Sequence, residues 1–241
     1  MQKRKAVTIL TVALVVVLGS AMALADNLSL GGSSNQLTVT GGTGGVAGTW
    51  GGGSIGPSTL NGDPLAWVYC VDIPDHVYIP GDYPNASFNN NGTIAGSSAN
   101  NTALGITGYT TDGQQAAVTN AMAVAYLLHT YATGAISNAA QAALQGAIWS
   151  VIYGVTMTGG PSGSLAIYSA DMNQVTAACG NNFNSCTNDY VGDFDWLSPS
   201  GSSSSVDQGL ITNKVPDGGM TLMLLGGTLV GVATLRRKFR V

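Results

Sequence analysis

The 241-residue sequence contains no glutamate and little charge of either sign. Charged residues make up 8% of the chain, whereas about a quarter is usual for a soluble protein. Eight Lys and Arg residues in total are too few for a surface that follows a phosphate backbone, which argues against nucleic-acid binding. The length fits one domain with small appendages, and the composition argues against a typical cytosolic enzyme.

The few basic residues are concentrated at the two ends of the chain. Lys3, Arg4 and Lys5 stand near the start, and four more lie within 236–240, which leaves Lys214 as the only basic residue between. Eleven of the twelve aspartates lie within 26–207. The central part is therefore strongly acidic, and the terminal basic clusters are typical of targeting signals.

Residues 1–25 have the pattern of a secretory signal peptide. A basic start is followed by an apolar run over 6–18 and by Ala23-Leu24-Ala25, a small-x-small cleavage site. We expect Asp26 to be the first mature residue. An uncleaved anchor helix is the alternative.

The C-terminal residues 215–241 combine three features in order. A short motif is followed by an apolar stretch over 220–235 and by a basic end. The sixteen apolar residues fall slightly short of the roughly 20 needed to cross a bilayer upright, and the positive-inside rule places the basic end in the cytoplasm. The motif and the first basic residues are Val215, Pro216, Asp217, Gly218, Gly219, Arg236 and Arg237.

This order of features resembles the PEP-CTERM class of sorting signals, and the motif is close to its VPDSG variant, from which Gly218 departs. The resemblance implies recognition by an exosortase-type membrane peptidase and removal of the tail. It also implies passage through the inner membrane and delivery to the surface or matrix of a Gram-negative bacterium. A permanent inner-membrane anchor is the alternative.

The body, residues 26–197, is predicted to be α+β, with short strands followed by an inserted helical block. Strands are expected at 28–30, 36–40, 66–73 and 76–79, where apolar and β-branched residues are bounded by glycine-rich turns. Residues 81–112 are expected to form a polar loop. A Ser-rich linker is expected over 198–214, before the C-terminal apolar helix.

Three helices are predicted from apolar spacing and end signals. The first covers 113–133 with Asp112 as its N-cap, the second covers 138–153 between Ser137 and Gly154, and the third covers 165–178.

The three cysteines are an odd number for an exported protein. Cys179 and Cys186 have six residues between them in a polar segment, a spacing that allows a short disulfide. Cys70 then remains as a buried thiol, although its pairing with either of the others stays open.

Cys70 belongs to the run Tyr69-Cys70-Val71-Asp72, and Leu144-Gln145-Gly146-Ala147-Ile148-Trp149 follows downstream. This ordered pair resembles the signature of bacterial surface thioester domains. The resemblance implies that the Cys70 sulfur attacks the Gln145 carboxamide and expels ammonia, which leaves an internal thioester. Supporting positions are Tyr69, Asp72, Ile148 and Trp149.

The helical spacing agrees with that chemistry. Gln145 and Trp149 are i,i+4 neighbours, and helical side chains lean toward the N-terminus, so Trp149 would cover the turn that holds Gln145 and exclude water. The body also lacks lysines of its own except Lys214. A plain amphipathic helix with an exposed Gln145 is the alternative.

Other chemistries have weaker patterns. His76, expected to meet solvent, and His129, expected to be buried, are candidates for a Cys-His nucleophile and base pair with Cys70. Asp189, Asp193 and Asp195 lack a calcium-loop register, so an acidic loop is expected and no metal or cofactor is predicted.

Together these patterns predict an exported protein that attaches itself once to an amine-bearing surface molecule, a protein lysine or another amine, and that is not a turnover enzyme. The alternative is a structural extracellular-matrix protein without a thioester, in which Cys70 is buried or disulfide-bonded.

Overall fold

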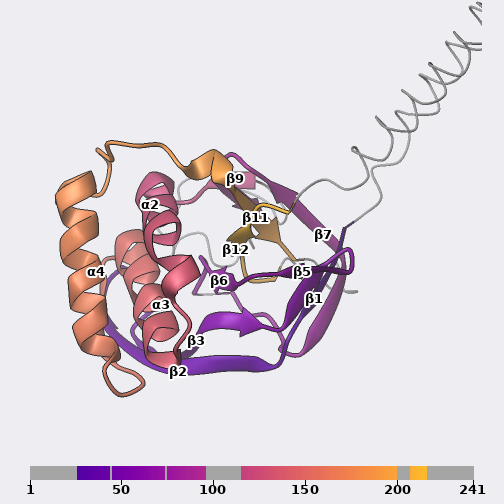
Figure 1. Cartoon of the computed structure of the whole chain (residues 1–241), viewed down its shortest axis with the longest axis horizontal. Helices are drawn as coiled ribbons and strands as arrows, with labels where there is room; N and C mark the ends of the chain where they lie inside the picture. The colour runs from indigo at the N-terminus through magenta and orange to yellow at the C-terminus, as the bar shows by residue number, and fades with distance from the viewer. Residues whose placement is uncertain (1–25, 44, 74, 96–114, 200–206, 216–241) are drawn as a thin grey trace, which may run out of the picture. The chain divides into compact units, whose positions relative to one another are not determined.

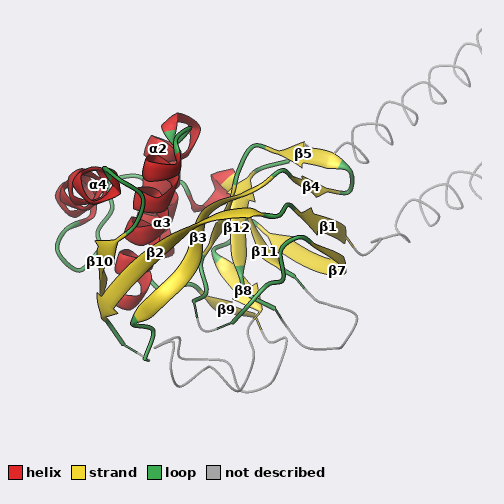
Figure 2. Ribbon diagram, turned by 90° about the horizontal axis from the view of Figure 1, so that it is seen from below, coloured by secondary structure: helices red, strands yellow, loops and turns green. Residues whose placement is uncertain are grey.

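The computed structural model describes residues 26–43, 45–73, 75–95, 115–199 and 207–215. In both views the helices gather on one side of this body and the sheets on the other (Figures 1 and 2). The body is therefore α+β, as the sequence predicts.

Seven antiparallel strands form the main sheet, which curves toward a nearly closed barrel and has the order β5-β4-β1-β7-β11-β12-β6. Neighbours in this sheet come from distant parts of the chain, since β6 pairs with β12 and β7 pairs with β11. The strands are β1 Asp26–Leu30, β4 Ser58–Leu60, β5 Asp63–Leu65, β6 Val68–Cys70, β7 Gly81–Asn89, β11 Phe194–Ser198 and β12 Leu210–Asn213.

Two smaller sheets complete the β-structure. One has the order β10-β2-β3, formed by β2 Ser33–Gly41, β3 Gly48–Gly56 and β10 Val155–Gly159. The other pairs β8 Thr93–Ala95 with β9 Gln115–Ala117. β3 also runs close to β6, where the Val68 N–H donates to the Ser54 hydroxyl at 3.3 Å.

The central helix α3, Asn138–Tyr153, contacts both other helices and the three-stranded sheet. All its residues from Ala142 to Tyr153 are buried, because this helix carries no charge and is apolar on nearly every side. The Ser137 hydroxyl caps its start by accepting from the Ala140 N–H at 3.2 Å, and Gly154 ends it in a left-handed conformation. The predicted bounds of this helix are confirmed.

The other two helices, α2 Ala121–Tyr131 and α4 Ser164–Cys179, pack on α3. The prediction for α4 is confirmed to within one residue at each end. The prediction of one helix over 113–133 is wrong at its start, because Gln115–Ala117 form strand β9 and α2 begins only after Asn120. The expected cap Asp112 lies outside the described residues.

Several strand predictions also need correction. Only Val68–Cys70 of the expected strand 66–73 form a strand, and residues 76–79 form none. The expected polar loop 81–112 contains β7 and β8. A polar strand such as β7 is held by main-chain hydrogen bonds to β1 and β11, which side-chain composition does not reveal.

The linker expected over 198–214 is wrong for its last part. Leu210–Asn213 form β12, a strand between β11 and β6 in the main sheet, and Leu210 and Ile211 are fully buried. The sequence predicts a linker here because the apolar run is short and follows a segment rich in serine. The body therefore includes these residues.

The predicted signal peptide and nearly all of the predicted C-terminal sorting signal lie outside the described residues, which end at Val215. None of the helices that the structure describes is long and apolar enough to cross a membrane.

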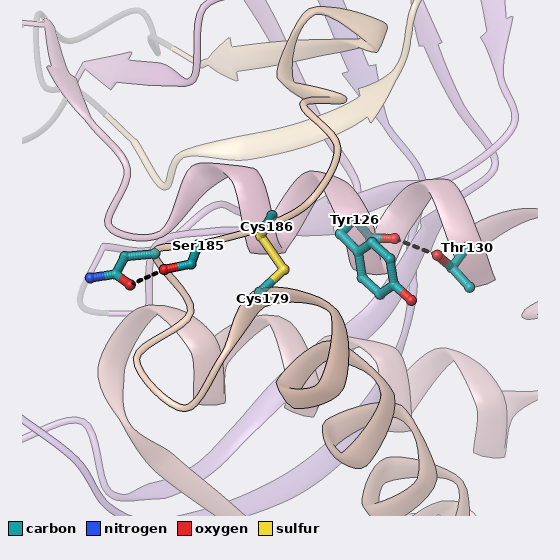
Figure 3. The surroundings of a disulfide bond; sticks show 6 residues. Tyr126, Thr130, Cys179, Ser185 and Cys186 are labelled. Carbon is teal, nitrogen blue, oxygen red and sulfur yellow. Dashed lines mark hydrogen bonds between the residues drawn. A yellow bond between two sulfur atoms is a disulfide. The ribbon is translucent and has the colours of Figure 1, made fainter.

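The predicted disulfide between Cys179 and Cys186 is confirmed (Figure 3). It joins the last residue of α4 to the loop that follows and lies beside α2, near Tyr126 and Thr130. Cys70 is free and buried.

Helix α4 carries a buried carboxyl group, Asp171. Asp171 is only 5% exposed, and its charge acts on the hydroxyl groups of Tyr69 and Tyr131. Burial raises the pKa of Asp171 to about 6, well above its ordinary value. The charged form of Asp171 is therefore unfavourable in the folded protein.

We predict that Asp171→Asn stabilises the protein at neutral pH. Because the folded-state pKa is raised, the wild type loses stability between about pH 4 and pH 6, as the unfolded chain releases this proton first. The variant should be more stable by about 2 kcal/mol at pH 7 and equal to the wild type near pH 4. Urea denaturation across this range measures the difference. A difference that does not change with pH would contradict the assignment.

Candidate functional site

Strand β6 brings Cys70 to the edge of the main sheet. Cys70 is the last residue of β6, pairs with Leu210 of β12, and is 3% exposed. Because β6 is the end strand in the sheet order, the main-chain groups of Cys70 that face away from β12 have no strand partner. A buried main-chain group without a partner is costly.

The side chain of Gln145, on α3, supplies that partner. The Cys70 N–H donates to Gln145 Oε1 at 2.9 Å, and Gln145 Nε2 donates to the Cys70 carbonyl at 2.7 Å. Gln145 is completely buried, so the alternative of a plain amphipathic helix with an exposed Gln145 is wrong. The structure thus brings together two residues that lie 75 positions apart.

The sulfur of Cys70 lies in an enclosed, weakly polar environment. Its thiol donates to the Asp72 carbonyl at 3.2 Å. The Trp149 indole N–H approaches the sulfur without reaching regular hydrogen-bond geometry. Burial raises the pKa of the Cys70 thiol strongly, and contacts with the Asp72 main chain and Trp149 offset only part of this rise. The thiol is therefore protonated at neutral pH.

A cavity of about 220 Å³ adjoins Cys70, Gln145 and Trp149. Its walls are mostly apolar and aromatic, and the rings of Trp50 and His76 are 6.0 Å apart between centroids. His76 is exposed, as expected from the sequence. A small ligand in this cavity would therefore lie beside both Cys70 and Gln145.

The glycines at 51–53 of β3 allow this strand to approach Gln145. A Cβ atom added to Gly52 would lie 2.5 Å from Leu37 Cδ2, 2.9 Å from Gln145 Cγ and 3.1 Å from Trp149 Cη2. Sequence reasoning missed this contribution. The signal was present, because consecutive glycines inside a strand often mark close approach of another group.

The predicted supporting residues have distinct environments. Tyr69 and Cys70 are adjacent in β6, so their side chains leave it on opposite faces, and the Tyr69 ring contacts Trp67. Burial and the charge of Asp171 raise the pKa of Tyr69. Ile148 and Trp149 are both fully buried in α3.

The histidine and aspartate candidates are arranged differently. His129 was expected to be buried, but its side chain is 49% exposed, stacks on Tyr190 and lies 3.8 Å from Asp193. That expectation is wrong because the last turn of α2 faces a surface 3₁₀ helix, Val191–Asp193. No hydrogen bond in the described part of the chain joins either histidine to Cys70.

The acidic residues near Trp196 bind main-chain groups. Asp189 accepts from the Val191 N–H, and Asp195 accepts from the N–H of Val215, the one residue of the predicted sorting motif that the structure describes. Within the described ranges, no three His, Cys or Asp side chains are grouped so that they could hold a metal ion.

Comparison with known protein families, with curated proteins and with solved structures found no match to this chain.

Gly52→Ala should disturb the site through packing alone. The added methyl group meets three buried side chains, so we expect a loss of about 1–3 kcal/mol in the free energy of unfolding. Urea denaturation measures the loss, with Gly134→Ala as the control, since a Cβ at Gly134 meets no atom within 4 Å. Equal stability of the two variants would show that the strand does not approach Gln145 as described.

Proposed function

We propose that this chain is an exported surface or matrix protein in which Cys70 and Gln145 form an internal thioester for one covalent attachment to an amine. The observation that carries the proposal is the buried Gln145 carboxamide, held against the main chain of Cys70 by two hydrogen bonds. The Cys70 side chain is attached to the same residue that the amide contacts. The amide therefore lies next to the residue whose sulfur has to reach its carbon.

The reaction balances without a cofactor. The Cys70 sulfur forms a bond to the Gln145 amide carbon, the carbon–nitrogen bond breaks, and the thiol proton leaves with the nitrogen as ammonia. The product is an acyl–sulfur bond at a position fixed by the fold. Holding the two reacting groups in place lowers the activation barrier, because the entropy of bringing them together has already been lost on folding.

Burial supports the proposal because a thioester must be protected from water. Both partners are at most 3% exposed, and the fully buried Trp149 covers the same turn of α3. The adjoining cavity offers a route for a small amine. The amine nitrogen would attack the acyl carbon of Gln145, form an amide and release the Cys70 thiol.

The scarcity of lysine is consistent with a thioester that reacts with an amine of another molecule. Lys214 is the only lysine within 26–215, it is exposed, and its amino group is 3.4 Å from the Gly192 carbonyl. It does not line the cavity. The body therefore has no lysine placed to consume its own thioester.

Several features that are typical of exported proteins support the proposed surface attachment. The Cys179–Cys186 disulfide is typical of an oxidising compartment outside the cytoplasm. The signal peptide and the sorting-like tail point to passage through the inner membrane and to an exosortase-type peptidase. We therefore propose the cell surface or matrix as the site of attachment, with an amine-bearing surface molecule as the partner.

A structural matrix protein is the second candidate, and one observation favours it. The Gln145 amide satisfies both main-chain groups at the edge of β6, a purely structural role that needs no reaction. In that case Cys70 is a small buried side chain.

Coupling of methylamine separates the two candidates. The wild-type chain should gain one methylamine at Gln145 and one free thiol, while Cys70→Ala should gain neither and still unfold cooperatively in urea. Peptide mapping should leave Gln141, one turn earlier on α3, unmodified. Absence of coupling in the folded wild type would defeat the thioester and favour the structural role.

A further inference from the structure

One buried hydrogen-bond donor in the site has no acceptor. The indole N–H of Trp149 is fully buried, and no atom of the described residues accepts it with regular hydrogen-bond geometry. Trp149 lines the same cavity as Cys70 and Gln145. An unpaired buried donor costs free energy and calls for an explanation, and a role in catalysis is one such explanation.

The indole lies beside both reacting side chains. Trp149 follows Gln145 by one turn of α3, and a Cβ atom added to Gly52 would lie 2.9 Å from Gln145 Cγ and 3.1 Å from Trp149 Cη2. The ring and the amide side chain therefore lie against the same residue of β3. Burial raises the pKa of the Cys70 thiol strongly, and the Trp149 N–H, which approaches the sulfur, offsets a small part of this rise.

Of the atoms that react, the sulfur is the one that lacks a donor. The Gln145 oxygen accepts from the Cys70 N–H at 2.9 Å, a position from which this N–H can stabilise the oxyanion formed during acyl transfer. The Cys70 thiol donates to the Asp72 carbonyl at 3.2 Å. Once the sulfur is a thiolate, it faces that carbonyl oxygen with no proton between them. A buried thiolate at this position therefore needs a donor, and the unpaired Trp149 N–H lines the same cavity.

We infer that the indole N–H of Trp149 is a catalytic hydrogen-bond donor to the Cys70 sulfur when the thioester opens. This inference rests on the proposed function. The amine nitrogen bonds to the Gln145 acyl carbon, and the carbon–sulfur bond breaks with its electron pair on the sulfur. The Trp149 N–H stabilises this thiolate until the sulfur takes up the proton that the amine nitrogen releases. The products are an amide at Gln145 and the free Cys70 thiol.

Removal of the N–H alone tests this role. The full chain is synthesised in a cell-free system with benzothienylalanine in place of Trp149, which keeps the bicyclic ring and has sulfur where the indole has its N–H. Coupling of methylamine, followed by intact mass, should be about 10- to 100-fold slower than in the wild type, the effect of one hydrogen bond to a charged group. Loss of ammonia during thioester formation should also be slower, because the thiol ionises in that step too.

Trp196 provides the matched control. It is fully buried in β11, and its N–H donates to the Val191 carbonyl at 3.2 Å. The same replacement at Trp196 should leave the coupling rate unchanged and lower the urea midpoint, whereas at Trp149 it breaks no regular hydrogen bond and should not lower the midpoint. An equal loss of stability at both positions would show that the Trp149 N–H is already paired, which would overturn the inference.

Trp149→Phe separates a donor from a side chain that only covers the thioester. The smaller ring admits water and amine, so a cover predicts faster hydrolysis and faster coupling, whereas a donor predicts that both become slower. The benzothienylalanine variant decides if the two variants differ, and Trp149→Phe decides if that variant does not fold. Coupling as fast as in the wild type, or faster, would overturn the inference alone. A wild type that never loses ammonia would overturn the proposed thioester as well.

Discussion

The pair of hydrogen bonds between the Gln145 carboxamide and the Cys70 main chain is the constraint on which the site depends. It completes the edge of β6 where no strand follows. It also fixes the rotation of α3, because a polar amide within a fully buried helix segment has to meet this edge. The glycines of β3 then bring that strand against Gln145. The edge strand β6, helix α3 and the glycine-rich part of β3 thus meet at the contact between Gln145 and Cys70.

The same contact has two consistent interpretations, one structural and one chemical. As a structural element it satisfies buried polar groups. As a chemical element it holds a carboxamide beside the residue that carries a buried thiol, with the fully buried Trp149 on the next turn of the same helix. The disulfide and the scarcity of lysine add independent support for an exported protein with an acyl group kept for an external amine.

Local signals in the sequence predicted part of this arrangement. The bounds of α3 follow from Ser137 and Gly154, and the disulfide follows from two close cysteines, because both features are decided within a few residues. The prediction that Cys70 and Gln145 act together came from a resemblance, while their contact depends on the whole topology. β12 and the close approach of the β3 glycines were missed because each acquires its role only from segments distant in the chain.

Intact-mass spectrometry of the purified, folded wild-type chain tests the central claim most directly. The proposed thioester predicts a mass lower by one ammonia than the sequence with its disulfide requires, whereas Cys70→Ala should have the full mass that its own sequence with the disulfide requires. A wild-type chain whose mass deficit is only the two hydrogens lost on forming the Cys179–Cys186 bond would contradict the claim.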